Sequence, residues 1–299
     1  MKILLFGKNG QVGWELQRAL APLGELIALD FDSVEAHADF SRPEGLAATV
    51  DLFAPDLIVN AAAHTAVDKA ESEPGFARAL NAQGPAVIAA AAARRGCTLV
   101  HYSTDYVFDG SGSAPRDEQA ATGPLSVYGR TKLEGEEAIR ASGCTHLILR
   151  TSWVYAARGG NFAKTMLRLA AERESLNVID DQVGAPTGAE LLADVTAHAV
   201  RVMRQRPALS GLYHAVAGGE TSWHGYARHV IGWAHQHGHA LKTKPDAVAP
   251  IATANYPTPA QRPLNSRLST RRLQDAFELH LPPWQSGVER MLAETLPNP

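Results

Sequence analysis

The sequence predicts an α/β protein: a doubly wound parallel sheet followed by a smaller C-terminal α/β domain. Two observations carry this prediction. Through the first half of the chain, short apolar segments without a polar face alternate with helical segments, which is typical of parallel strands covered by helices on both sides. The first apolar segment also runs straight into a glycine-spaced turn and a helix. Such alternation implies right-handed crossover connections around one sheet.

Five strands are predicted in the first half of the chain, at residues 3–6, 26–30, 56–60, 99–103 and 146–150. Four helices are predicted between them, at residues 11–21, 43–53, 76–95 and 127–141. In the second half, helices at 161–174 and 189–206 flank a strand at 176–179. After Trp233 prolines and histidines become frequent, which predicts loops that cover a binding face.

The bulk composition limits the classes of function. The chain has 299 residues, of which 45% are hydrophobic and 20% charged, as in ordinary soluble proteins. Its net charge of −3 argues against a nucleic acid or an anionic membrane as partner. No apolar run approaches the roughly 20 residues of a membrane span, and no leader peptide precedes the first strand, so we expect a cytoplasmic protein. Cys97 and Cys144 are predicted to be buried free thiols.

Three glycines, Gly7, Gly10 and Gly13, lie between the first strand and the first helix. Glycines there let the backbone turn tightly and approach a pyrophosphate, and the helix N-terminus offers free N–H groups. The spacing is G-x-x-G-x-x-G, so it matches the G-x-G-x-x-G fingerprint of Rossmann domains in mechanism but not in letter. A tight turn without a ligand is the alternative. We predict a Rossmann domain that binds NAD(P) at 1–150, joined by part of 175–205, and a mainly substrate-binding domain at 151–299.

Tyr128 and Lys132 lie four residues apart on a predicted helix, so their side chains share one face. A phenol is a poor acid at neutral pH, but a nearby ammonium stabilises the phenolate and lowers the phenol pKa. The pair is therefore predicted to be a proton donor, although the same spacing often arises by chance. Thr104 follows the fourth strand, where its hydroxyl can donate to a substrate carbonyl oxygen.

Other residues that follow strands point to the adenosine and ribose of a nicotinamide dinucleotide. Asp30 ends the second strand about 20 residues after the glycines, where an acid binds ribose hydroxyls and repels a 2′-phosphate. This favours NADH, but nearby basic residues can offset the effect, so the choice between NADH and NADPH stays open. Asp39 and Phe40 are expected beside the adenine, and residues 63–65 beside the cofactor.

Four motifs occur together in this chain: the three glycines, Asn-Ala-Ala-Ala at 60–63, Ser-Thr-Asp-Tyr-Val-Phe-Asp-Gly at 103–110, and Tyr-x-x-x-Lys at 128–132. As a set they resemble the extended short-chain dehydrogenase/reductase family. Further stretches resemble the branch of that family that reduces a dTDP-linked 4-keto sugar, at residues 63–71, 150–155, 161–166, 181–187 and 262–266. The resemblance covers nearly the whole chain.

The resemblance implies the last step of dTDP-rhamnose biosynthesis, which serves polysaccharides such as the lipopolysaccharide O-antigen. In this step NADPH or NADH reduces the C4 ketone of dTDP-4-dehydro-6-deoxy-L-mannose to dTDP-L-rhamnose. By similarity, Tyr128 donates the proton, Lys132 holds the nicotinamide ribose and Thr104 polarises the ketone. Asp105 and Trp153 would contact the sugar. The implied cofactor-binding residues are Gly7, Gly10, Gln11, Val12, Gly13, Asp30, Asp39, Phe40, Ala63, His64, Thr65, Tyr102, Tyr128 and Lys132.

Expectations for the rest of the site rest on single residues. Arg262 and Arg267 are candidates for the substrate diphosphate, because a guanidinium pairs phosphate oxygens bidentately. Gln182 is a candidate for contact with the base. The resemblance also implies a structural Mg²⁺ at a homodimer contact, a hard cation suited to carboxylate ligands. Its implied ligands are Glu15, Glu190 and Asp194. A solvated acidic helix face is the alternative.

Two other functions stay open on the sequence. One is another sugar-nucleotide reductase or epimerase of the same family, which as an epimerase would keep its NAD⁺ and consume no NADH. The other is a non-catalytic NAD(P)-binding regulatory subunit. The presence of Thr104, Tyr128 and Lys132 argues against it, because a purely binding role needs no proton donor.

Overall fold

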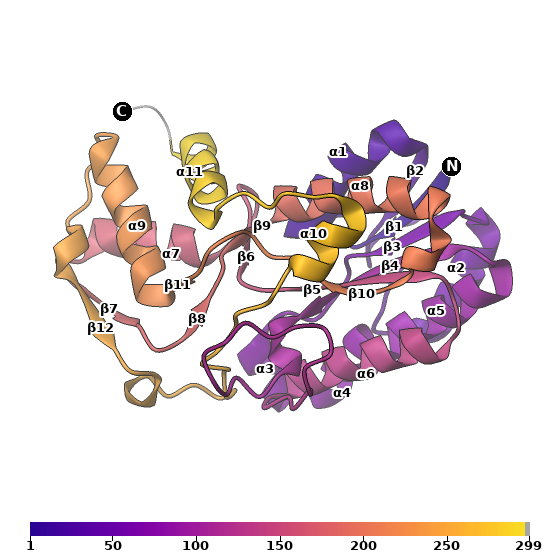
Figure 1. Cartoon of the computed structure of the whole chain (residues 1–299), viewed down its shortest axis with the longest axis horizontal. Coiled ribbons are helices and arrows are strands. Elements are labelled where there is room, and N and C mark those ends of the chain that lie inside the picture. Colours follow the sequence, from indigo (N-terminus) through magenta and orange to yellow (C-terminus); the bar gives the residue numbers. More distant parts are fainter. Residues whose placement is uncertain (297–299) are drawn as a thin grey trace.

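The protein, described here over residues 1–296 of a computed structural model, is built around one six-stranded sheet (Figure 1). The strand order is β10-β5-β4-β3-β1-β2, and all neighbouring strands are parallel. The strands are β1 (Lys2–Phe6), β2 (Glu25–Leu29), β3 (Leu57–Asn60), β4 (Thr98–Thr104), β5 (His146–Thr151) and β10 (Gly211–His214).

Helices cover both faces of the sheet, and successive strand residues point into two separate cores. In β1, Ile3 and Leu5 belong to one core, whereas Leu4 and Phe6 belong to the other. The first core includes residues of α1 (Gln11–Leu20), α8 (Ala189–Gln205) and α10 (Arg271–Phe277). The second includes residues of α2 (Leu46–Phe53), α5 (Gly84–Arg95) and α6 (Val127–Ala141). Figure 1 shows the two helix groups on opposite sides of the sheet.

The topology creates a crevice where the chain changes direction. From β1 the chain moves to β2 on one side and then returns to β3 on the other, so the loops after β1 and β3 diverge. Ligands of doubly wound sheets bind at such a switch point, beyond the carboxyl ends of the strands. The register aligns Phe6 with Asn60, Asn60 with His101, and Thr104 with Thr151. Polar side chains from neighbouring strands therefore gather at this edge.

A smaller α/β unit lies beyond this edge, on the left in Figure 1. Its helices are α7 (Phe162–Glu172), α9 (Trp223–Gln236) and α11 (Trp284–Thr295). Three short strand pairs accompany them: β7 (Leu176–Ile179) with β12 (Val248–Ile251), β8 (Val183–Gly184) with β11 (Thr221–Ser222), and β6 (Val154–Tyr155) with β9 (Thr187–Gly188). Tyr226, Trp284 and Val288 are buried in its core. The chain crosses to this unit after β5 but returns to the sheet with α8 and β10.

The predicted fold class is confirmed, and the five predicted strands are present to within one residue at each end. The sixth strand, β10, was not predicted. The helix predicted at 76–95 is continuous from Pro74 but has three parts: α4 (Pro74–Arg78), a π-helix (Ala79–Gln83) and α5. The π-helix includes Asn81, whose side chain bonds the backbone of His64. Single π turns of this kind often accompany functional sites.

The prediction of loops after Trp233 was wrong for several segments, because α9 continues to Gln236 and β12, α10 and α11 follow. Within residues 1–296, none of the prolines after Trp233 lies in the interior of an α-helix: Pro250 lies in β12, and Pro257, Pro259 and Pro263 lie in the irregular segment before α10. Pro245 opens a short 3₁₀ turn, and Pro283 caps α11. Proline is tolerated at helix starts because the first N–H groups have no intrahelical partner. The prediction of loops therefore holds for the segment between Asn255 and Arg271, which contains Pro257, Pro259 and Pro263, but not for the segments on either side.

The structure bears on two further expectations. Cys97 and Cys144 are free and buried, as predicted. Within residues 1–296, none of the helices combines the length and apolar character needed to cross a bilayer.

Candidate active site

Two glycines of the glycine-spaced turn are required by close backbone contacts, and the third is not. Gly7 has a φ of +85°, and a Cβ there would approach Ala62 N to 2.6 Å. A Cβ on Gly13 would overlap Gly7 O, because helix α1 packs directly on the turn. Gly10 differs, since a Cβ there would meet only Gly7 O, at an ordinary 3.5 Å. The protein itself therefore requires glycine at 7 and 13, whereas glycine at 10 leaves space for a ligand.

The start of α1 has the features that a dinucleotide needs. Gly10 is its N-cap, and no side chain caps the first N–H groups. Such a helix N-terminus favours phosphate through free N–H donors and its positive dipole end. The side-chain oxygen Oε1 of Gln11 is buried and has no hydrogen-bond partner within residues 1–296. These residues fit the pyrophosphate and the adjoining ribose of NAD(P).

One pocket of about 440 Å³ joins this turn to the predicted catalytic residues. Its walls come from the carboxyl ends of the strands, the start of α6 and two segments of the smaller unit. The predicted residues that line it are Gly10, Gln11, Val12, Ala63, Thr65, Tyr102, Thr104, Asp105, Tyr128, Lys132 and Trp153. The structure thus brings together predicted residues that are up to 143 positions apart in the sequence, from Gly10 to Trp153.

Tyr128 lies in the first turn of α6, which begins where the Ser126 hydroxyl accepts from the N–H of Gly129. Burial raises the pKa of Tyr128 to about 12, and the charge of Asp105 adds to this, while a hydrogen bond with Thr104 opposes it. The prediction that Lys132 lowers the pKa of Tyr128 was wrong for the protein without ligands, because desolvation of the phenol dominates. Tyr128 is consequently a protonated phenol at neutral pH, which a proton donor must be.

Lys132 is buried, with only 2% of its surface exposed. Its Nζ donates to the carbonyl oxygen of Tyr102 at 2.6 Å. The Tyr102 hydroxyl is 2.6 Å from Thr196 Oγ1 on α8, so this tyrosine links the lysine to the helix layer. Burial lowers the pKa of Lys132 to about 8 from its ordinary 10.5, although Glu136 opposes the shift. A buried ammonium with one carbonyl partner can hold a ligand hydroxyl.

Asp105 and Trp153 also line the pocket. Burial raises the pKa of Asp105 to about 6, and Thr104 donates a hydrogen bond to its Oδ1 at 3.1 Å. Trp153 has a φ of +48°, an uncommon conformation for a bulky residue and one often found at functional sites. Its ring stacks on Trp223 with the centroids 3.7 Å apart. The two indoles together make an apolar wall.

Several predicted cofactor contacts have other partners. Both carboxylate oxygens of Asp30 accept backbone N–H groups, of Asn9 and Phe31, each at 2.8 Å. The Asp39 carboxylate accepts from Ser41 and Arg42, and the Phe40 ring is a core side chain packed against Phe6. These three predicted side chains therefore hold the loop after β2, and none of them lines the pocket.

His64 also turns away from the pocket. Its Nε2 is 2.8 Å from Glu73 Oε1, its ring packs edge-on against Phe76, and Asn81 holds its backbone. Its neighbours Ala63 and Thr65 do line the pocket. The His64 side chain thus anchors the loop that presents them.

The side chains predicted to contact the diphosphate and the base form hydrogen bonds with other residues of the protein. Arg262 makes a bidentate pair with Asp68, at 2.7 and 3.1 Å. Arg267 Nε donates to Glu220 at 2.8 Å. Gln182 is buried, and its Oε1 accepts from the indole N–H of Trp223 at 3.1 Å. In this structure the two arginines connect segments of the chain, and Gln182 bonds the Trp223 indole. Their contacts with the diphosphate and the base stay predictions.

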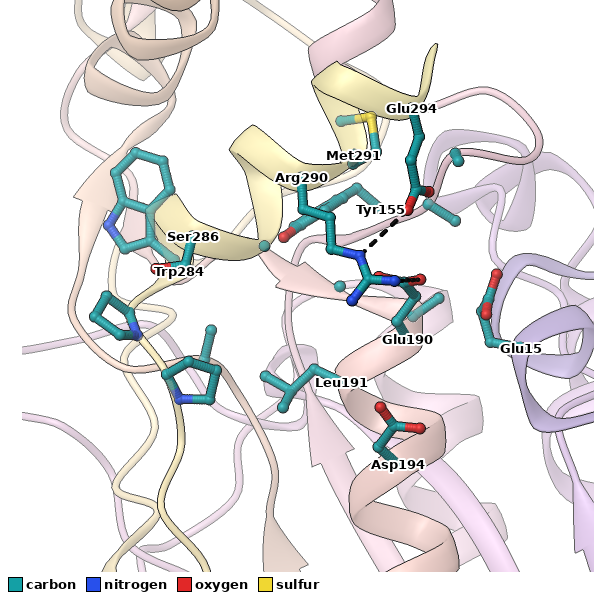
Figure 2. A pocket seen from close by; sticks show the side chains of 18 residues that line it. Glu15, Tyr155, Glu190, Leu191, Asp194, Trp284, Ser286, Arg290, Met291 and Glu294 are labelled. Carbon is teal, nitrogen blue, oxygen red and sulfur yellow. Dashed lines mark hydrogen bonds and ion pairs between the residues drawn. The ribbon is translucent and has the colours of Figure 1, made fainter. Parts of the chain in front are cut away.

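The predicted metal ligands Glu15, Glu190 and Asp194 line a separate pocket, shown in Figure 2. Arg290 of α11 pairs with Glu190 at 3.4 Å, and Arg18 pairs with Asp194 at 2.9 Å. No three carboxylate, histidine or cysteine side chains within residues 1–296 are grouped so that they could hold a metal ion. Within one subunit, Glu190 and Asp194 are paired with arginines and do not form a Mg²⁺ site by themselves. A Mg²⁺ at a homodimer contact stays a prediction.

Eight residues that line the pocket were not predicted individually: Ala61, Val67, Ser103, Tyr106, Thr151, Ser152, Val154 and Trp223. Thr151 ends β5, and its hydroxyl is buried without a partner within residues 1–296. The rule that ligands bind at the carboxyl ends of strands, which found Thr104, would also have found Thr151. No local signal marks Trp223, since it reaches the pocket from α9 in the smaller unit.

Comparison with known proteins agrees with this geometry. The family described as the RmlD substrate binding domain matches residues 1–296. The dTDP-4-dehydrorhamnose reductase of Shigella flexneri is 62% identical over 98% of both chains. The chain belongs to the dTDP-4-dehydrorhamnose reductase family. Family membership confirms the predicted resemblance and the predicted class of enzyme, a nicotinamide-dependent oxidoreductase.

Solved structures of the dTDP-4-dehydrorhamnose reductase family share the fold along almost the entire chain. The enzyme of Clostridium acetobutylicum superposes with a TM-score of 0.87 at 34% identity, over 98% of this chain and 99% of that one. The enzyme of Bacillus anthracis, solved in complex with NADP, gives 0.86 at 32% identity, over 98% and 99%. Homodimer formation, a role in O-antigen synthesis and a cytoplasmic location stay predictions.

Proposed function

We propose that this protein uses NADPH or NADH to reduce the C4 ketone of dTDP-4-dehydro-6-deoxy-L-mannose, giving dTDP-L-rhamnose. The observation that carries the proposal is that Thr104, Tyr128 and Lys132 line one pocket with the uncapped start of α1. The names of the relatives and their identity over the full length support the choice of sugar. Fold similarity alone would not do so.

The residues of the pocket divide the chemistry among them. A bound reduced nicotinamide supplies the hydride that reaches C4. In the complex the Thr104 hydroxyl would donate to O4, where negative charge develops, in place of Asp105 Oδ1. The O–H bond of Tyr128 breaks as its proton passes to O4, which completes the alcohol and leaves a phenolate. The ammonium of Lys132 stabilises that phenolate and holds the nicotinamide ribose.

The elevated pKa of Tyr128 is compatible with this role. A phenol with a pKa of about 12 is fully protonated when the ketone binds. The alkoxide that forms at O4 is a much stronger base than a phenolate, so the proton transfer remains downhill. Tyr128 and Lys132 line the same pocket and would together hold the ribose of the bound cofactor.

The sugar is proposed to lie between Asp105 and the indole of Trp153. Asp105 Oδ2 is buried and has no partner within residues 1–296, so it can accept a sugar hydroxyl. The stacked Trp153 and Trp223 offer an apolar face to the C6 methyl side of a deoxyhexose. We propose that residues 1–150, with α8, mainly hold the cofactor and that residues 151–299 mainly hold the sugar nucleotide.

The test is to generate the 4-keto sugar nucleotide in situ and to follow NADH and NADPH oxidation separately. We expect stoichiometric oxidation of at least one cofactor and formation of dTDP-L-rhamnose. Tightly bound NAD⁺ without net oxidation would instead point to an epimerase. Cofactor binding without any turnover would point to a regulatory subunit, and either result contradicts the proposal.

A further inference from the structure

His101 is a buried titratable residue to which the proposed reaction assigns no role. It lies on β4, only 1% of its surface is exposed, and it does not line the pocket. Its ring bridges two polar side chains: Nδ1 is 3.0 Å from Asn60 Nδ2, and Nε2 is 3.4 Å from Lys132 Nζ. It therefore stands directly behind the lysine that the proposed reaction uses.

The surrounding hydrogen bonds determine which ring nitrogen carries the proton. Asn60 Oδ1 accepts the backbone N–H of Ala62 at 3.1 Å, so its NH₂ group must be the one that faces His101. An NH₂ group only donates, so Nδ1 must present its lone pair. Burial is the main cause that holds the pKa of His101 well below its ordinary value, and the charge of Lys132 adds to it. The ring is therefore neutral. A neutral ring without a proton on Nδ1 carries it on Nε2.

Lys132 consequently faces an N–H group rather than a lone pair. An ammonium cannot donate to that nitrogen, so within residues 1–296 the carbonyl of Tyr102 is its one hydrogen-bond acceptor. The remaining ammonium protons are left for groups in the pocket. The N–H dipole of His101 also disfavours the charged lysine and can donate to the neutral amine.

We propose that Asn60 and His101 act as positioning residues, fixing the Nε2–H tautomer so that Lys132 directs its free N–H groups into the pocket and loses its proton more readily. The proposal rests on the proposed function for its effect on catalysis, but the tautomer is a property of the protein alone. The proposal explains why residue 60 is an amide. An aspartate has the same shape and would pack equally well, but its carboxylate would accept from Nδ1–H and so reverse the tautomer.

Other charged and titratable groups around Lys132 do not produce the same effect. From α6, Tyr128 is a neutral phenol and Glu136 favours the ammonium. Arg150 of β5 bonds both oxygens of Glu136, at 2.6 and 2.9 Å, which largely neutralises that charge. Burial lowers the pKa of Lys132, and in our proposal the N–H dipole of His101 acts in the same direction.

The first experiment is a long-range ¹H–¹⁵N NMR spectrum of the ¹⁵N-labelled wild-type protein without cofactor. The chain has 12 histidines, and the signals of His101 are those lost in His101→Leu. We expect an unprotonated Nδ1 and a protonated Nε2 that do not titrate between about pH 6 and 9. A protonated Nδ1 would overturn the proposal whether or not the enzyme reduces the sugar.

The second experiment measures kcat/KM against pH for the wild type and Asn60→Asp. The introduced carboxylate accepts from Nδ1–H, so Nε2 becomes an acceptor for Lys132, and we expect the alkaline pKa of the profile to rise by about one unit. The negative charge of that carboxylate acts in the same direction, and Asn60→Asp in a His101→Leu background measures this direct effect. The proposal requires the shift to be at least halved there; an undiminished shift contradicts it.

A control variant separates this effect from general changes in stability. His198→Gln alters a histidine of α8 that bonds the carbonyl of Phe277 and does not line the pocket. Its pH profile should match that of the wild type. If the wild type shows no ketone reduction, the proposed function fails, while the NMR spectrum still decides the tautomer.

Discussion

Lys132 carries a charge that burial makes costly, so the residue that serves the reaction weakens the fold. The folded pKa of about 8 lies below the ordinary 10.5, so stability rises with pH between these values. Above pH 10.5 the amine is neutral and its burial costs no charge penalty. This stability is lost as the pH falls through 8, where the buried group becomes charged. At neutral pH the protein therefore holds an unfavourable buried ammonium. Active sites commonly combine such instability with function.

We expect Lys132→Met to raise the free energy of unfolding at pH 7 by about 1–3 kcal/mol, since a buried charge is replaced by an apolar chain of similar length. The gain should shrink as the pH rises from 8 toward 10.5. The same variant should lose about two orders of magnitude or more in kcat/KM. Urea unfolding and steady-state kinetics check this, with the exposed Lys69→Met as control. A destabilised Lys132→Met would contradict the account of Lys132.

At the scale of elements, the turn between β1 and α1 contains glycines of two kinds: Gly7 and Gly13 are required by the fold, whereas Gly10 leaves space for a ligand. A Cβ at position 13 overlaps Gly7 O, whereas a Cβ at position 10 meets ordinary contact distances. Substitutions at these two positions should therefore separate loss of folding stability from loss of cofactor binding.

We expect Gly10→Ala to fold normally and to raise KM for NADPH or NADH at least about tenfold, because the methyl group occupies the space of the pyrophosphate. Gly13→Ala should instead lower the free energy of unfolding by more than about 2 kcal/mol, through displacement of the turn. Thermal unfolding and cofactor titration distinguish the two variants. Equal loss of stability in both would show that Gly10 is structural.

Elements were more predictable than contacts. The strands of the first half are continuous apolar segments, so hydrophobic pattern alone located them, and the i, i+4 spacing placed Tyr128 and Lys132 on one face of α6. The functions assigned to Asp30, Arg262 and Gln182 depended on which partner each side chain meets. Those partners, Asn9, Asp68 and Trp223, come from distant segments, and a single sequence does not reveal such pairings.

At the scale of the whole molecule, the pocket is completed by the smaller unit. Trp223 comes from α9, and Gln182 and the ring of Trp153 hold it in place. Thr151 and Ser152 lie where the chain passes from β5 to this unit. Under the proposed division, the sheet and its helices hold the cofactor and the smaller unit holds the sugar, so the two sites should respond separately to mutation.

We expect Trp223→Ala to raise KM for the sugar nucleotide about tenfold and to leave KM for NADPH or NADH within about twofold, because it removes one half of the indole wall. Trp233→Ala is the matched control, since Trp233 lies on the same helix but stacks on His237. Its KM values should stay at those of the wild type. A larger effect of Trp223→Ala on the cofactor than on the sugar would contradict the division of the pocket.

The most direct test of the central claim is the rate of C4-ketone reduction by Tyr128→Phe, measured with saturating cofactor. The variant keeps the ring that packs edge-on against Tyr106 and loses only the hydroxyl. We predict that kcat falls by roughly 10²–10⁴-fold while cofactor affinity and thermal stability stay close to wild type, because the proton donor alone is lost. Turnover within a few-fold of the wild type would show that the proton comes from elsewhere.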